Sequence, residues 1–509
     1  MARTDTDLSN ALYQDYFSRP RNWTLTGTDR TALFTVLACL LLVRLVLMIW
    51  LPMTDTTEAR YAEIARKMLE TGNWITPQYD YGVPFWGKPP LHTWASGLGM
   101  KLFGVGHFGA RFPILLFAIG VLSVVYVFVR RFLGGDLGLI CVAVLASSVL
   151  FFGASAFVMT DMVLVFGTTL SMCGFFVAVT GQPRGRAWEN AFFVGLAIGL
   201  LAKGPVALVL TGLPIFLWLL VGGRWHKLRR IRWGRGSLLL ALLSLPWYAA
   251  AEFNTPGFLQ YFIIGEHFDR FVVPGWKGDL YGSGHAQPTG IIWLYACVAF
   301  VPWIVYAGAL FWKMTDIGEQ ILDDTQGWHS YLLFWAISPM LLFTPAANLL
   351  PSYVLPALPA SSILLCSLWV GFHDKPKQRA KLLFLGAVCG TGALYLCLSL
   401  ALIFVPQSLN LRTENALTAR VLDLDPNLRL TYWGERTYSA EFYSAARVTF
   451  TQDLSDVTAL RINTQRDAFV VPTHLLPQVS HIIADDFENV GVFRNKHLLV
   501  EKVHEEMPL

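Results

Sequence analysis

The sequence predicts a polytopic α-helical membrane protein of about eleven spans, followed by one small water-soluble domain. Three observations indicate this fold class. Of the 509 residues, 54% are hydrophobic and only 15% are charged, whereas soluble domains carry about 25% charged residues. Apolar stretches recur between Thr31 and Pro406, and a helix needs ~20 such residues to cross a bilayer. The 18 Trp and 17 Tyr suit the aromatic belts found at membrane interfaces.

The apolar stretches place the expected spans near residues 31–51, 108–129, 137–154, 161–180, 188–202, 205–222, 236–253, 289–312, 329–345, 352–372 and 382–405. Alternate connections between the spans are rich in Lys and Arg, most of all residues 224–235. Short basic connections stay on the cytoplasmic side of a membrane, which explains this cluster without a nucleic-acid partner. The acidic connection 315–328 departs from the alternation. With the N-terminus inside, eleven crossings put the C-terminal domain outside.

Three regions make up the expected domain organisation. Residues 1–30 are polar and show no cleavable signal, so we expect a cytoplasmic segment before an uncleaved first span. Residues 31–406 form the expected transmembrane domain, with outer loops at 53–107 and 254–288. Strand-length apolar runs then predict an outer α/β cap domain over 407–509, with strands at Leu428–Trp433, Ala468–Val471, Val490–Phe493 and Leu498–Val503. All seven cysteines lie in apolar stretches, so neither disulfides nor a cysteine-ligated metal is expected.

The first outer loop contains the leading candidate for a catalytic residue. Asp55 and Glu58 precede a run of helically spaced apolar residues that ends at Gly72. This pattern predicts an N-capped amphipathic helix that lies on the membrane surface, with its apolar face in the headgroup region. Two interpretations of Asp55 remain open: a helix cap, or a carboxylate that faces an outer cavity, since ionisable residues at membrane depth mark functional sites.

Further charged residues lie at the expected outer face. Pro89 and Pro90 keep Lys88 out of a helix, which leaves its ammonium either snorkelling at the interface or free to bind phosphate. Asp161 and Lys203 stand at the ends of two expected spans, and a Gly-Pro pair after Lys203 would end its helix. The segment 265–270 adds a cluster with Glu266, His267 and Arg270, and an arginine can bind a phosphate through two parallel hydrogen bonds.

Six motifs occur in order along the chain: Asp55-x-x-Glu58-x-Arg60-Tyr61, Gly87-Lys88-Pro89-Pro90 with Trp94, Thr160-Asp161, Leu201-Ala202-Lys203-Gly204-Pro205, Glu266-His267-Phe268-x-Arg270-Phe271, and Leu350-Pro351-Ser352-Tyr353-Val354-Leu355-Pro356. This ordered set resembles the bacterial membrane glycosyltransferases of the protein-mannosyltransferase superfamily, especially the branch that contains the lipid A aminoarabinose transferases. One position departs from that branch, which tends to have a Glu where this chain has Gly87.

The resemblance implies a C-type glycosyltransferase fold in a bacterial inner membrane, and an undecaprenyl-phosphate-linked or similar polyprenyl-phosphate-linked sugar donor used at the periplasmic face. It implies a catalytic role for Asp55, with Glu58 and Asp161 as further acidic candidates. It also implies donor-phosphate binding by Lys88 and Arg270, joined by Lys203 and Arg60. His267 and Tyr353 are expected to line the cavity. A divalent cation is conceivable only if the fold brings Asp55, Glu58, His267 and Asp161 together.

The expected chemistry is one inverting displacement. A sugar on a lipid phosphate is already activated, so the enzyme must bind the phosphate, align the acceptor and accept its proton. A hydroxyl acceptor would use Asp55 as general base, whereas a lipid A phosphate would need no base. The acceptor can be lipid A, another glycan or a protein, and the sequence does not identify it.

Two other functions fit parts of the pattern. A transporter or flippase for a lipid-linked sugar would share the spans and the basic cavity, but transporters show internal repeats and midplane charges. Here no repeat is visible, and only Arg44 lies near the middle of a span. A ligase or polymerase for surface polysaccharide would share the donor chemistry and differ in its acceptor.

Overall fold

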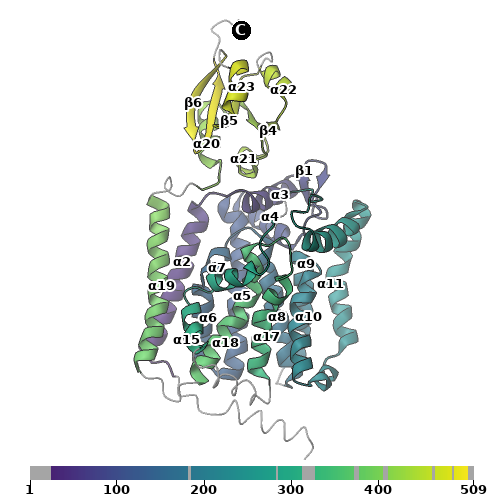
Figure 1. Cartoon of the computed structure of the whole chain (residues 1–509), viewed down its shortest axis with the longest axis vertical. Helices are drawn as coiled ribbons and strands as arrows, with labels where there is room; N and C mark the ends of the chain where they lie inside the picture. Colours follow the sequence, from purple (N-terminus) through teal and green to yellow (C-terminus); the bar gives the residue numbers. More distant parts are fainter. Residues whose placement is uncertain are drawn as a thin grey trace, which may run out of the picture.

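The computed structural model describes residues 24–181, 185–282, 285–311, 327–371, 378–404, 411–460, 465–483 and 486–502. Within these ranges a helical bundle bears a smaller C-terminal domain at one end (Figure 1). Several features expected from the sequence lie outside the described residues: most of the N-terminal segment, Arg184, the acidic connection up to residue 326, and Lys375 and Lys377.

In the described residues, each expected span corresponds to one helix or to two consecutive helices. The helices are α2 (Gly27–Trp50), α5 (His107–Leu133), α6 (Gly135–Ser147) with α7 (Val149–Ala154), α8 (Thr160–Val179), α9 (Gly185–Lys203), α10 (Val206–Val221), α11 (Trp233–Asn254), α14 (Ile291–Ala299) with α15 (Ile304–Phe311), α17 (Trp328–Phe343), η3 (Pro351–Ala357) with α18 (Leu358–Gly371), and α19 (Gln378–Phe404). A short 3₁₀ turn, η1 (Trp225–Arg230), connects α10 to α11.

Six helices in the described ranges are long and apolar enough to cross a membrane, and the α14–α15 pair would make a seventh. Three further expected spans coincide with shorter apolar helices, namely α6, α10 and α17. The chain is therefore a multi-pass helical membrane protein, as the composition predicts.

Two of the expected spans are not continuous helices. The span expected over 289–312 bends by 106° between α14 and α15. Pro302 lies in that break, and a proline interrupts a helix because it lacks an amide hydrogen. The span expected over 137–154 is divided at Ser148, whose backbone is extended. The hydroxyl of Ser148 donates to the Val144 carbonyl, which satisfies one of the backbone groups freed at the break.

Small residues determine the close packing of α8 against α9. A methyl group at Gly195 would lie 2.5 Å from the Gly167 carbonyl oxygen, and one at Gly174 would lie 2.6 Å from the Phe192 nitrogen. Backbones that approach this closely exclude any side chain, and membrane helices use small residues at such interfaces. This pair carries Asp161 and Lys203 to the outer end of the bundle, since one begins α8 and the other ends α9.

The first outer loop forms α3 (Thr57–Thr71), the hairpin β1 (Gln78–Asp80) and β2 (Val83–Pro84), and α4 (Leu91–Phe103). The end of α3 is as expected, because Gly72 caps it with φ of 69°. The prediction that its apolar face lies in the headgroup region is wrong, because protein covers that face. Residues Glu58–Met68 of α3 are buried apart from half-buried Arg60, because α4, β1 and the C-terminal domain all pack against the helix (Figure 1).

The second outer loop contains α12 (Phe258–Gln260), the π-helix η2 (Tyr261–Asp269) and α13 (Arg270–Val272). An asparagine in the connection between α17 and η3 anchors this loop, because the Asn348 side chain donates to the carbonyls of Arg270 and Val273. This contact fixes the segment that carries Glu266 and Arg270 against η3 and the bundle.

The C-terminal domain is a five-stranded mixed sheet with helices. Its elements are α20 (Asn415–Leu424), β3 (Arg429–Trp433), α21 (Tyr438–Ser444), β4 (Val448–Thr451), α22 (Leu454–Leu460), β5 (Asp467–Pro472), α23 (Leu476–Ile483), β6 (Phe487–Phe493) and β7 (Lys496–Glu501). The strand order is β4-β3-β5-β7-β6, with β3 parallel to β4 and β5 and the other pairs antiparallel. The four expected strands are present. The fifth, β4, was not predicted because its short sequence mixes polar and apolar residues.

Candidate active site

A cavity of about 430 Å³ lies at the end of the bundle that bears the C-terminal domain (Figure 1). The first outer loop, the start of α8, the end of α9, the second outer loop and η3 all contribute to its lining. The expected site residues Asp55, Arg60, Lys88, Asp161, Lys203, Arg270 and Tyr353 line it. Seven candidates from five separate segments therefore meet in one place. Pockets for small ligands usually measure ~300–1,000 Å³, so a phosphosugar headgroup is of suitable size.

Two cations of this cavity converge on one carboxylate. Lys88 donates to Glu266 Oε2 at 2.6 Å, and Arg270 lies 3.2 Å from the same oxygen. Arg270 also pairs with Asp279 at 3.1 Å. Glu266 is only 2% exposed at its side chain. Burial would raise the pKa of Glu266, but Lys88 and Arg270 bring it below its usual value. The Glu266 carboxylate is thus charged, and it holds the Lys88 ammonium and the Arg270 guanidinium next to the same oxygen.

A second ion pair lies deeper, where α8 and α9 meet the cavity. Lys203 donates to Asp161 Oδ1 at 2.6 Å. Its ammonium also lies 4.2 Å from the centre of the Tyr353 ring, within the range of a cation–π interaction. As expected, Lys203 ends its helix, because Gly204 follows with φ of 85° and Pro205 comes next.

Asp55 does not cap α3. The residue before that helix is Thr56, and no side chain caps the first turn. Both Asp55 oxygens instead accept hydrogen bonds from Ser439 in the C-terminal domain: Oδ1 from the amide at 2.9 Å and Oδ2 from the hydroxyl. The cap interpretation is therefore wrong for this carboxylate, which faces the cavity.

Two of the expected residues do not reach the cavity. Glu58 is buried, accepts two hydrogen bonds of 2.7 Å from Arg111, and lines a different cavity beside α2. The structure thus separates Glu58 from Asp55 and gives it a pairing role. His267 lies in a small neighbouring cavity, with its ring nitrogens 2.8 Å and 3.1 Å from the carbonyls of Phe262 and Lys203.

The condition under which Asp55, Glu58, His267 and Asp161 could hold a cation is not met, because Glu58 and His267 lie outside the cavity that Asp55 and Asp161 line. Over the described ranges, no group of three or more His, Cys, Asp or Glu side chains is arranged to hold a metal ion. The acids near the cavity are instead each bonded to a cation or to Ser439. These residues do not fit a divalent cation.

Sequence reasoning missed several partners. Glu266 was recognised only as part of a charged cluster, and Asp279, Arg111 and Ser439 were not singled out. Several of them contact a residue far away in the sequence: 178 positions separate Lys88 from Glu266, and 384 separate Asp55 from Ser439. No local pattern encodes such pairs. The only available signal was the motif around Glu266 itself.

A second cavity of about 670 Å³ adjoins the first and is lined mostly by the C-terminal domain. Asp55 and Thr56 line both cavities. The Asp55 carboxylate therefore stands at their junction, with basic Arg412, Arg436 and Lys496 among the residues on the far side.

Residues 29–262 match the family model of the dolichyl-phosphate-mannose-protein mannosyltransferases. Similar curated proteins are undecaprenyl phosphate-alpha-4-amino-4-deoxy-L-arabinose arabinosyl transferases. The one from Edwardsiella ictaluri is 31% identical over 62% of this chain and 55% of its own length. The one from Yersinia pestis is 28% identical over 70% of this chain and 61% of its own length. The matches thus span only about half to three fifths of these relatives.

Solved structures share the fold. ArnT from Cupriavidus metallidurans, bound to undecaprenyl phosphate, superposes with a TM-score of 0.76 at 19% identity, covering 95% of this chain and 100% of that one. The Archaeoglobus fulgidus oligosaccharyltransferase in the apo form superposes with a TM-score of 0.53 at 12% identity, covering 91% and 72%. The resemblance found in the sequence therefore has support: this multi-pass membrane protein has the C-type glycosyltransferase fold, and part of its chain is similar in sequence to the dolichyl-phosphate-mannose-protein mannosyltransferases and the aminoarabinose transferases.

Proposed function

We propose that this chain transfers a sugar from a polyprenyl phosphate, in the first instance undecaprenyl phosphate, to an acceptor of the bacterial envelope. The observation that carries the proposal is the convergence of Lys88 and Arg270 on one oxygen of Glu266 inside an outer cavity. Two cations held this close form a binding site for a phosphate, and preorganised charges cost no rearrangement as the bond breaks.

The proposed reaction is a single displacement at the anomeric carbon. Lys88 and Arg270 bind the donor phosphate, and Arg60 and Lys203, the latter held by Asp161, line the same cavity. The acceptor oxygen forms the new bond as the bond to the phosphate oxygen breaks, and the anomeric centre inverts. The leaving group is the polyprenyl phosphate anion. For a hydroxyl acceptor, Asp55 takes the proton, because it is the carboxylate at the junction of the two cavities.

The names of the similar curated proteins favour 4-amino-4-deoxy-L-arabinose as the first sugar to test. Lipid A is the first acceptor, with other glycans and proteins as alternatives. Gly87 stands where the aminoarabinose branch tends to have a Glu, and a side chain there would lie 3.0 Å from Phe85 and 3.3 Å from Tyr281. Aromatic rings thus occupy the space that a side chain at position 87 would take. Because this part of the cavity differs from that of the aminoarabinose branch, the identity of the sugar has to be measured directly.

The proposal includes an orientation. The protein lies in the inner membrane with its N-terminus in the cytoplasm, and residues 53–107, 254–288 and 407–509 lie in the periplasm. The basic connection between α10 and α11 and the C-terminal domain occupy opposite ends of the bundle (Figure 1), which supports this arrangement because basic connections stay inside.

The test combines mass spectrometry of lipid A with donor kinetics. Cells that express the wild-type chain should gain a pentosamine or hexose mass on lipid A, and Asp55→Asn should abolish it at equal protein level. In purified protein, Lys88→Ala should raise KM for the donor about 10-fold or more, since hydrogen bonds to charged groups contribute ~1.5–3 kcal/mol. Lys101→Ala is the matched control, because Lys101 is exposed at the far end of α4.

Each arm can contradict the proposal. Identical lipid A with and without the wild-type chain removes lipid A as acceptor, and the same comparison on envelope glycans and periplasmic proteins then decides between the alternatives. Donor turnover or transport that persists in Asp55→Asn without any glycosylated product would favour a flippase.

A further inference from the structure

The C-terminal domain supplies the only hydrogen bonds recorded for the Asp55 side chain in the described part of the chain. Ser439 donates its amide to one carboxylate oxygen and its hydroxyl to the other. The Asp55 amide in turn donates to the Arg412 carbonyl at 2.7 Å. A residue of the first outer loop is thus attached at three points to a segment more than 350 positions away.

The direction of the Ser439 hydroxyl bond is determined by its other contact. The Glu414 amide donates to Ser439 Oγ at 3.0 Å. A hydroxyl has one proton to donate, and the amide contact takes up one of its lone pairs. The proton of Ser439 therefore points at Asp55. Two donors on one carboxylate favour its ionised form, which is the form a general base requires.

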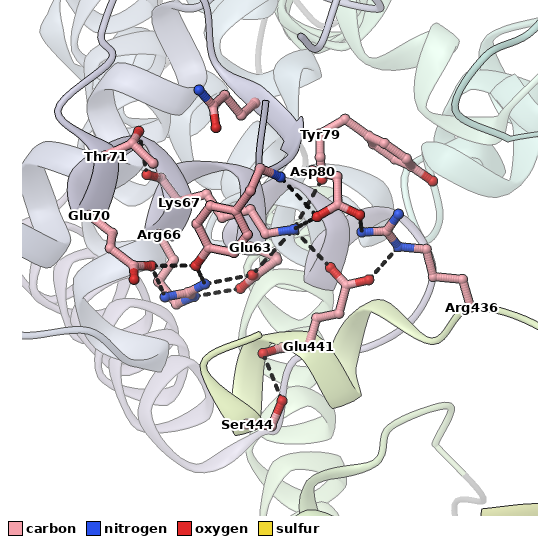
Figure 2. A network of polar contacts seen from close by, with 12 residues as sticks. Glu63, Arg66, Lys67, Glu70, Thr71, Tyr79, Asp80, Arg436, Glu441 and Ser444 are labelled. Atoms are coloured by element: carbon pink, nitrogen blue, oxygen red, sulfur yellow. Dashed lines mark hydrogen bonds and ion pairs between the residues drawn. The ribbon is translucent and has the colours of Figure 1, made fainter. Parts of the chain in front are cut away.

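A separate set of contacts keeps α21 in place. Lys67 of α3 is buried and pairs with Glu441 of α21 at 3.2 Å. Arg436, just before α21, pairs with Glu441 and with Asp80 at 3.1 Å, and the hydroxyls of Tyr79 and Tyr438 lie 2.6 Å apart. Figure 2 shows the charged residues of this inter-domain network, which extends through Lys67 to the pair of Glu63 and Arg66. It joins the domain to the first outer loop without involving Asp55.

We infer that Ser439 is a positioning residue of the reaction: it orients the Asp55 carboxylate at the junction of the two cavities, and its two hydrogen bonds favour the ionised form. The inter-domain network holds Ser439 in that position, so the C-terminal domain completes the active site instead of only covering it. This inference rests on the proposed role of Asp55 as the base.

The charges around Asp55 give the expected direction of the effect. The pKa of Asp55 lies above its usual value, because burial raises it more than the two Ser439 bonds lower it. On the domain side Glu414 raises it and Lys496 lowers it, with Arg412 nearby. On the side of the helical bundle, Arg60, Lys88 and Asp161 line the first cavity together with Asp55. Loss of the hydroxyl bond removes a stabilising donor from the ionised form, so the pKa of Asp55 rises.

The test is the pH profile of sugar transfer in Ser439→Ala, Ser439→Thr and the control Ser444→Ala. A base acts when deprotonated, so a raised pKa moves the acidic limb of kcat to higher pH, by on the order of one unit for one hydrogen bond to a charged group. KM for the donor should stay unchanged. Ser439→Thr retains a hydroxyl and should restore the wild-type limb. Ser444 lies at the other end of α21, and its hydroxyl donates to the Glu441 carbonyl. Its variant should therefore match the wild type.

A second measurement separates this inference from the proposed function. Carbodiimides react with protonated carboxyl groups, so the pH midpoint of labelling at Asp55, followed by peptide mass spectrometry, reports its protonation without any activity. We expect a higher midpoint in Ser439→Ala and a wild-type midpoint in Ser439→Thr. An unchanged midpoint and an unchanged pH profile in Ser439→Ala overturn the inference even if Asp55→Asn is inactive. If the labelling midpoint shifts in Ser439→Ala but Asp55→Asn transfers sugar at the full rate, Asp55 is not the base. Ser439 then affects only the protonation of Asp55 and not the reaction.

Discussion

The pair of Lys203 and Asp161 combines a structural and a functional role at the scale of single residues. Their side chains are 12% and 8% exposed, and their charged atoms lie 2.6 Å apart. Removing one partner leaves a buried charge without compensation, which typically costs about 3–5 kcal/mol, whereas removing both is often nearly neutral.

We therefore expect Lys203→Met and Asp161→Asn each to lower the thermal stability of the detergent-solubilised protein. The double variant should recover most of that loss, because no uncompensated charge remains. Its transfer activity should not recover, since the cavity has lost a cation next to Tyr353. Recovery of both quantities in the double variant would show that the pair serves stability alone.

At the scale of elements, the α8–α9 interface decides where this pair lies. Its glycines allow backbone contact, and at Gly195 a methyl group would meet Gly167 and Ser171 at 2.5 Å. Nothing flexible can give way there, because the Gly167 atom and one of the Ser171 atoms that it would meet are backbone.

We expect Gly195→Ala to separate the two helices, lower the midpoint of thermal unfolding and reduce transfer by displacing Asp161 from Lys203. Gly212→Ala is the control: it lies inside α10 with open space around a new methyl group. There the higher helix propensity of Ala, ~1 kcal/mol over Gly, should leave stability equal or raise it. Equal midpoints for both variants would mean that the interface tolerates separation.

At the scale of the whole molecule, the site lies between two bodies. The membrane bundle supplies the cations and Asp161, the first outer loop supplies Asp55, and the C-terminal domain binds Asp55 through Ser439. The inter-domain network makes this arrangement specific, because its buried charges would lose their partners if the domain moved away.

The proposed orientation predicts a labelling pattern. In a variant without the seven native cysteines, Asp423→Cys on α20 should react with a membrane-impermeant maleimide in intact spheroplasts. Arg229→Cys, in the connection between α10 and α11, should react only after permeabilisation. Both positions are exposed, so the difference reports the side of the membrane. The reverse pattern would place the cavity in the cytoplasm and exclude a periplasmic reaction.

Local sequence patterns were enough to predict the helices, several helix ends and most of the strands. Hydropathy located a helix at each expected span, Gly72 and Gly204 marked helix ends, and Pro89-Pro90 kept Lys88 out of α4. Four of the five strands of the C-terminal domain followed from short apolar runs. The ordered motifs gathered most of the residues that line the cavity, because each motif is short enough to recognise along the chain.

The partners of the charged side chains could be identified from the tertiary structure but not from the sequence. Glu58 and Asp55 are three residues apart, yet one pairs with Arg111 and the other with Ser439. The burial of α3 likewise depends on what packs against it. The physical reason is that a buried charge needs a partner in space, whatever its distance along the chain. Sequence patterns report only the neighbours on the same helix or strand.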